Sequence, residues 1–180
     1  MTAKLSRDAI ADAATELVAE VGEAGFTMSG LSARLFTVPA NLYNYTGGRD
    51  DVLDAVFQRA QAGLFDSLDG KSDDPPVEAL RAGLRKVSRW ATDNPNLIAL
   101  IRTRTRRLDD LNDASALVGT QLGRAAESGD ITSSDGFEES AGYVTAALAA
   151  QLFYLTSVDV FGDELEARLI KTLELLIGGL

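Results

Sequence analysis

The stretch from Phe26 to Leu53 constrains the fold most, because it holds two short apolar segments separated by a break of a few residues. In the first segment, the Thr27 hydroxyl can cap the start of a helix, and Leu31 and Leu35 lie four residues apart on one helical face. Pro39 then suits the first turn of a second helix, where an N–H would have no partner. Two short helices joined by a tight turn form a helix-turn-helix, whose second helix can enter the major groove of DNA.

The rest of the chain carries apolar residues at helical spacing. The segments with this spacing are 5–22, 48–68, 77–93, 96–108, 111–128, 137–161 and 163–177. No segment alternates in the manner of a strand, so the sequence predicts an all-α fold. We expect a three-helix helix-turn-helix domain at residues 1–48, joined to a helical domain at residues 49–180.

Two residue types are missing, and their absence limits the chemistry of the chain. It has no cysteine and no histidine, which excludes disulfides, thiol catalysis, imidazole general bases and zinc sites of the usual Cys/His kind. Adjacent acids such as Asp50–Asp51 and Glu138–Glu139 stand at helix starts or loops, where they complement the helix dipole. We therefore expect no enzyme activity, no cofactor and no metal site.

The sequence has no feature of a membrane protein. It contains no run of eighteen apolar residues, and its first ten residues lack the apolar core of a signal peptide. We expect a cytoplasmic protein.

The charge distribution is unusual for a nucleic-acid binder. The net charge is −10, and residues 1–50 hold four cations against six acids. From Leu35 to Gly48 there is no charged residue. Because DNA affinity depends largely on cations that meet phosphates, we expect weak binding to bulk DNA.

The helix-turn-helix stretch resembles the N-terminal domain of the TetR family of bacterial transcriptional regulators. It fits the family's motif without a gap at Leu31, Ala33, Leu35, Pro39, Leu42, Tyr43, Arg49 and Leu53, and Leu5–Gly22 is similar to the family's first helix. The resemblance covers about a third of the chain. It implies a dimer that binds a palindromic operator in double-stranded DNA and a small-molecule effector that alters operator affinity.

The sequence departs from the family's motif within the second helix and its flanks. Phe36 replaces a glycine, Val38 a Ser or Thr cap, Asn44 an often basic residue, Tyr45 a histidine and Thr46 a phenylalanine. A positive φ is common at such a turn and is awkward for an aromatic residue. We expect the helix-turn-helix to keep its shape, with Phe36 buried where the lost phenylalanine would pack.

The candidate DNA contacts lie in this stretch. Asn41 and Asn44 are three apart on one face, where Asn can pair with an adenine edge, or else they form a polar solvent face. Neutral donors and one arginine can bind phosphate. The full candidate set is Thr27, Ser29, Thr37, Pro39, Ala40, Asn41, Tyr43, Asn44, Tyr45 and Arg49.

The larger C-terminal part offers candidates for an effector site and for a dimer interface. The effector candidates are Trp90, Arg104, Gln121, Tyr143 and Phe153, which can line a cavity or belong to ordinary core and solvated helix faces. The last two helices carry excess apolar surface, from Val144 to Leu155 and from Leu165 to Leu176, so we expect a homodimer through both.

The expected function is a TetR-like transcriptional regulator, most simply a repressor. The alternative keeps the same fold in a ligand- or protein-binding protein that has lost operator binding. The uncharged recognition segment and Phe36 keep that alternative open.

Overall fold

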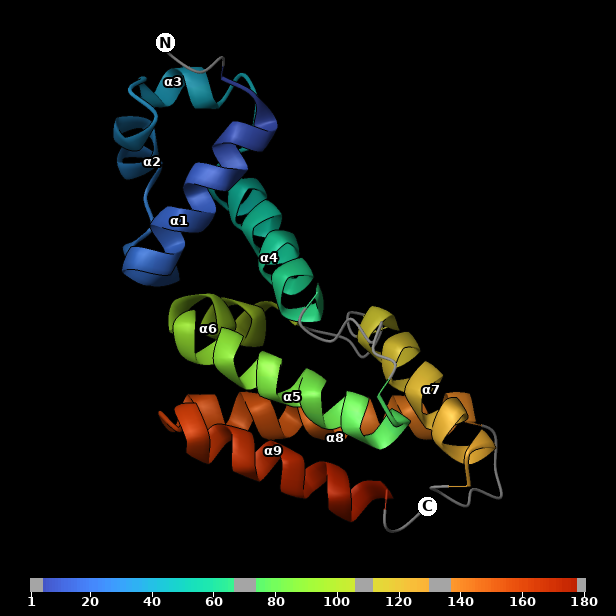
Figure 1. Ribbon diagram of the computed structural model, residues 1–180. Coiled ribbons are helices and arrows are strands. Elements are labelled where there is room, and N and C mark those ends of the chain that lie inside the picture. Colours follow the sequence, from blue (N-terminus) through green and yellow to red (C-terminus); the bar gives the residue numbers. More distant parts are fainter. Residues whose placement is uncertain (1–4, 67–73, 106–111, 130–136, 178–180) are drawn as a thin grey trace. The chain divides into compact units, whose positions relative to one another are not determined.

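The computed structural model describes residues 5–66, 74–105, 112–129 and 137–177. In these ranges all regular secondary structure is helical, which confirms the predicted all-α fold (Figure 1). The helices are α1 (Arg7–Gly25), α2 (Met28–Arg34), α3 (Pro39–Leu42), α4 (Arg49–Asp66), α5 (Pro76–Asp93), α6 (Pro95–Arg104), α7 (Asn112–Glu127), α8 (Phe137–Ser157) and α9 (Gly162–Ile177). None of the helices in the described part is both long enough and apolar enough to cross a membrane.

The chain divides into two compact units. The first comprises Met1–Ala62 and Asn94–Arg104, and the second comprises Gly63–Asp93 and Thr105–Leu180. The first unit therefore continues beyond residue 48 through most of α4, and it also takes in α6. The boundary of a DNA-binding domain at residue 48 stays a prediction about function.

The first unit is built on caps and a small apolar core. Ser6 Oγ accepts a hydrogen bond from the Ala9 N–H at 3.1 Å, and Thr27 Oγ1 accepts one from the Gly30 N–H at 3.0 Å. These bonds start α1 and α2, so the predicted Thr27 cap is confirmed. The buried apolar side chains of α1 to α4 include Ile10, Ala14, Val18, Phe26, Leu31, Leu42, Val52, Leu53 and Val56.

The helix α1 is interrupted near its end, at the point where it contacts α6. Gly22 has φ +70°, a left-handed conformation that interrupts the helix. A Cβ at Gly22 would also lie 3.2 Å from Asn96 Oδ1 on α6. The Asn96 amide donates to the Ala19 carbonyl at 2.9 Å, which joins α6 to α1 just before the break.

The second unit packs α5, α7, α8 and α9 together. α5 contacts both α7 and α9, and α8 contacts both α7 and α9. The Gly162 N–H donates to Thr92 Oγ1 at 2.9 Å, and Ser88 Oγ donates to the Gly162 carbonyl at 3.3 Å. These two bonds attach the start of α9 to α5, and the buried stripe Leu165, Leu169 and Leu173 continues the contact.

Candidate nucleic-acid interface

The helix-turn-helix forms as predicted, and its turn shows why position 36 needs a left-handed backbone. The Phe36 N–H donates to the Ala33 carbonyl at 3.1 Å, and the Thr37 N–H donates to the Ser32 carbonyl at 2.9 Å. This pair of bonds closes the end of α2, and it requires a positive φ at the residue after the cap. Phe36 has φ +51°, so the expected backbone conformation is present without glycine.

The expectation that Phe36 is buried is wrong. Its side chain is 91% exposed. Thr46, which stands where the family has phenylalanine, is half-buried and its hydroxyl donates to the Leu42 carbonyl at 3.1 Å. Leu42 is fully buried below α3, and the space beside Thr46 is a small pocket instead of a site for the Phe36 ring.

Most of the candidate DNA contacts are exposed around α3. Ala40, Asn41 and Asn44 face solvent, as do Tyr43 and Tyr45. Among the other candidates, Ser29 is exposed and Thr37 and Pro39 are half-buried. The exposed hydroxyl of Thr27 is committed to its cap.

The Asn41 side chain is oriented by a neighbour. Its amide Nδ2 donates to Thr37 Oγ1 at 3.0 Å. Because Asn41 is exposed, its amide oxygen and its second N–H can still bind a partner from outside the protein. The structure therefore holds one of the two candidate asparagines in a fixed position next to the turn.

Internal ion pairs occupy the arginines near the helix-turn-helix. Arg34 on α2 contacts Glu16 and Glu20 of α1 at 2.9 and 2.8 Å. Hydrogen bonds that Arg34 donates to the carboxylates of Glu20 and Glu16 raise its pKa above the usual value. Arg59 on α4 contacts Asp8 and Asp12 at 3.3 and 3.0 Å.

Arg49 has a structural role that the sequence did not reveal. Its Nη2 donates to the Glu23 carbonyl at 2.7 Å and its Nε to the Phe26 carbonyl at 3.4 Å. The guanidinium also lies 5.9 Å from the centre of the Phe26 ring. Arg49 thus holds the end of α1 against the start of α4, while its contact with a DNA phosphate stays a prediction.

Arg104 is separated from the other effector candidates. It belongs to the first unit, where its side chain is 16% exposed and pairs with Glu23 at 3.0 Å and Asp54 at 2.5 Å. Burial lowers the pKa of Arg104, but the hydrogen bonds and charges of Glu23 and Asp54 outweigh it, so the pKa is raised. Its Nε is buried and makes no hydrogen bond.

The remaining effector candidates lie in the second unit. Gln121 is buried on α7, and its Oε1 accepts a hydrogen bond from Arg124 at 3.1 Å. Trp90 and Phe153 are half-buried, whereas Tyr143 is 69% exposed. Tyr143 therefore presents its ring to solvent instead of lying in the core of the unit. The role of these residues in effector binding stays a prediction.

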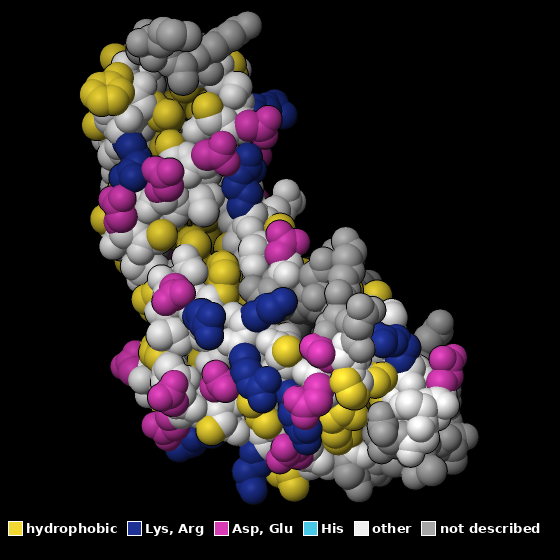
Figure 2. Space-filling model, viewed as in Figure 1, with side chains coloured by type: hydrophobic (Ala, Val, Ile, Leu, Met, Phe, Trp, Pro, Cys, Tyr) yellow, Lys and Arg dark blue, Asp and Glu magenta, His cyan; other side chains and the backbone are white. Residues whose placement is uncertain are grey.

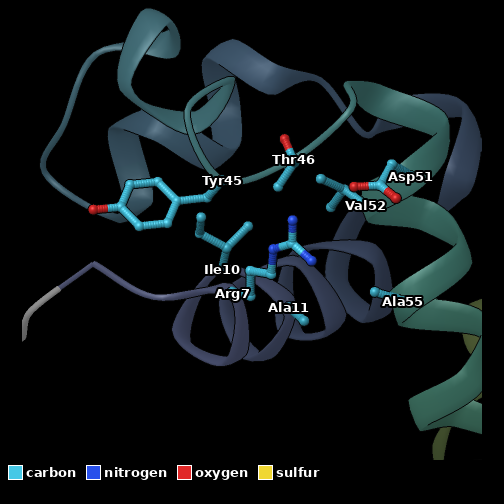
Figure 3. A pocket seen from close by; sticks show the side chains of 8 residues that line it. All are labelled: Arg7, Ile10, Ala11, Tyr45, Thr46, Asp51, Val52 and Ala55. Atoms are coloured by element: carbon cyan, nitrogen blue, oxygen red, sulfur yellow. The ribbon is translucent and has the colours of Figure 1, made fainter.

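A small pocket lies between α1, α4 and the segment that follows α3 (Figure 3). Its volume is about 140 Å³, and it is lined by Arg7, Ile10, Ala11, Tyr45, Thr46, Asp51, Val52 and Ala55. Pockets for drug-sized molecules have volumes of roughly 300–1,000 Å³, so this one is too small for such an effector. In Figure 3 the Arg7 side chain points toward Thr46 and Asp51, across the pocket.

The surface carries no concentrated positive charge on the face that Figure 2 shows. Lys and Arg side chains lie interspersed with Asp and Glu over the described residues of that face (Figure 2). Around the helix-turn-helix, Arg34, Arg49 and Arg59 each form an ion pair with a nearby acid. No cluster of three or more acids that could hold a metal ion occurs in the described part of the chain.

Comparisons with known proteins give structural matches only. The sequence matches no protein-family model and no curated protein. SmeT, the repressor of the multidrug efflux pump SmeDEF of Stenotrophomonas maltophilia, matches with a TM-score of 0.76 and 19% identity, over 99% of this chain and 92% of its own. A TetR-family transcriptional regulator from Pectobacterium atrosepticum matches with a TM-score of 0.77 and 20% identity, over 97% of this chain and 93% of its own.

A third match was solved with a ligand. The transcriptional regulator FadR from Bacillus subtilis, in complex with stearoyl-CoA, has a TM-score of 0.73 and 19% identity, over 95% of this chain and 97% of its own. These matches extend over the helix-turn-helix and the C-terminal helices alike, and the proteins matched are regulators of transcription. The chain therefore has the fold of the TetR-family transcriptional regulators, as the helix-turn-helix motif in its sequence indicated.

Proposed function

We propose that this protein is a transcriptional regulator, most simply a repressor, that binds a palindromic operator as a dimer and responds to a small-molecule effector. One observation carries the proposal. The helix-turn-helix is intact, and the side chains around α3 that can contact bases are exposed and held only locally. A purely structural use of this segment would not require an exposed surface of this kind.

The proposed operator contacts divide into two groups. Asn41 and Asn44 are the candidates for base edges, and Ser29, Tyr43 and Tyr45 offer exposed hydroxyl groups for phosphates. The complete proposed set remains Thr27, Ser29, Thr37, Pro39, Ala40, Asn41, Tyr43, Asn44, Tyr45 and Arg49. Residues 1–48 would form the DNA-binding part, and residues 49–180 the part that binds the effector and dimerises.

Exposed apolar side chains on the last two helices support the proposed dimer. Tyr143 and Tyr154 on α8 are 69% and 63% exposed, and Leu175 on α9 is 69% exposed. Tyr143 and Tyr154 are eleven residues apart, about three helical turns, so they lie on one face of α8. Pairing of α8 and α9 with the same helices of a second copy would cover these side chains in a four-helix interface.

The proposed effector site uses the candidates of the larger part of the chain. Trp90, Gln121, Tyr143 and Phe153 belong to the second unit, where a buried Thr145 hydroxyl on α8 without a hydrogen bond adds a polar atom. Arg104 belongs to the first unit and remains a separate candidate. FadR from Bacillus subtilis was solved with stearoyl-CoA, and SmeT represses a multidrug efflux pump. We propose that the protein acts in the cytoplasm. There, an effector would shift the population between two conformations of the protein that differ in operator affinity.

A gel-shift titration tests this function. Full-length protein is titrated against the DNA upstream of its own gene, with unrelated DNA of the same length as a competitor. The proposal expects a shifted complex that the unrelated DNA does not displace. Equal binding to both DNAs, or none to either, would reject operator binding.

The alternative function is a ligand- or protein-binding protein that keeps the fold and no longer binds an operator. The observation that favours it is the internal pairing of Arg34, Arg49 and Arg59, which removes cations from the surface available to phosphate. Failure of the gel shift together with a ligand that raises the melting temperature of the protein would support this alternative.

A further inference from the structure

We infer that the helix-turn-helix recognises A·T base pairs and makes no bidentate arginine contact to guanine. The surface concerned consists of the exposed side chains of Val38, Ala40 and Asn41, and it is called the recognition surface below. The inference rests on the proposed operator binding and names the bases that this binding would select.

Direct recognition of each base in the major groove requires a particular chemistry. Guanine presents two acceptors, which a guanidinium or ammonium group contacts best. Adenine presents one acceptor and one donor, which match the amide of Asn or Gln, and thymine presents a methyl group that prefers an apolar contact. A bidentate contact that selects guanine at α3 therefore needs a cation that is free to enter the groove.

No cation of α2, α3 or α4 is free to enter the groove. Arg34 is held between two glutamates of α1, and Arg59 between two aspartates of α1. Arg49 is held by the carbonyls at the end of α1. Arg7 points across the pocket toward Thr46 and Asp51 (Figure 3). The segment 35–48, which contains α3, has no charged residue of its own.

The groups that remain on the recognition surface fit an A·T pair. The bond from Asn41 Nδ2 to Thr37 Oγ1 at 3.0 Å fixes the amide and leaves one N–H and the amide oxygen for adenine N7 and N6. Val38 is 56% exposed, and its carbonyl accepts a hydrogen bond from the Asn41 N–H at 3.0 Å, which keeps the two residues close together at the start of α3. The methyl groups of Val38 and Ala40 can then contact thymine methyls beside the adenine.

A two-stage experiment with the full-length protein tests the inference. In the first stage, binding sites are selected from a random duplex library, and A·T pairs should be enriched in each half-site. In the second stage, single atoms of the selected duplex are removed: 7-deazaadenine lacks N7, and deoxyuridine lacks the thymine methyl. Loss of N7 at the contacted adenine should weaken binding by roughly 5- to 100-fold, the range for a specific base contact.

The variant Asn41→Ala supplies the matched control, because it should bind the normal and the 7-deazaadenine duplexes equally. In the same way, Val38→Ala should reduce the effect of deoxyuridine, and circular dichroism confirms that both variants are folded. Enrichment of G·C pairs, or a 7-deazaadenine effect that is equal in wild type and Asn41→Ala, overturns the inference while operator binding stands. Failure to enrich any duplex overturns operator binding and the inference together, and then favours a protein partner for this uncharged surface.

Discussion

Replacement of Phe36 separates the strain of the turn from the packing of its side chain. An L-residue in the left-handed region costs about 1–2 kcal/mol, and glycine loses about 0.5–1 kcal/mol more backbone entropy on folding than alanine. The Phe36 ring is 91% exposed, so its removal forfeits almost no buried surface. Phe36→Gly should therefore stabilise the protein by about 0.5–1 kcal/mol.

The matched variant is Phe36→Ala, which removes the ring and keeps the strained backbone. It should change the free energy of unfolding by less than about 0.5 kcal/mol, as surface substitutions usually do. Urea unfolding followed by circular dichroism gives both values, and hydrogen exchange of the α2 amides localises the change to this turn. If Phe36→Ala lowers the free energy of unfolding by about 2 kcal/mol, the ring is packed against the protein. If the Phe36→Gly variant is less stable than the Phe36→Ala variant, the backbone at this position is not left-handed.

Three further predictions concern the ion pairs and the dimer. Arg49→Ala removes two hydrogen bonds and a ring contact, so it should destabilise the protein by about 1–3 kcal/mol in urea unfolding, and an unchanged midpoint would contradict the role given to Arg49. Arg104→Met removes the ion-pair partner of Glu23, so the free energy of unfolding should fall by about 1–3 kcal/mol. Lys86→Met, on an exposed face of α5, is the control and should leave the free energy of unfolding almost unchanged. Leu175→Asp should convert the proposed dimer to a monomer in light scattering at micromolar concentration, and a variant that keeps the dimer mass would exclude α9 from the interface.

Local signals in the sequence predicted the helix-turn-helix well. The Thr27 cap, the leucine spacing and Pro39 depend on residues within four positions of one another, and all three features are present in the structure. The positive φ at position 36 follows from the same local geometry. The direction of the Phe36 ring depends instead on packing against residues that are distant in the sequence, and the ring faces solvent.

Contacts between distant residues could not be predicted from the sequence. Arg104 pairs with Glu23, which is 81 positions away, and Arg49 binds the carbonyl of the same residue. Only the fold brings α6, α4 and the end of α1 together, so the sequence pattern could not indicate which arginine becomes buried among acids. The exposed ring of Tyr143 shows the same limit for the effector candidates, because helical spacing does not say which apolar face remains uncovered.

The central claim is that two helix-turn-helix segments of a dimer contact successive major grooves of one operator. The most direct measurement compares the affinity of the full-length protein for three duplexes: the palindromic site selected from random DNA, the same site with one half scrambled, and the same site with five base pairs inserted between the halves. Five base pairs rotate the half-sites to opposite sides of the duplex. The account predicts tight binding to the intact palindrome alone, and equal affinity for all three duplexes would contradict it.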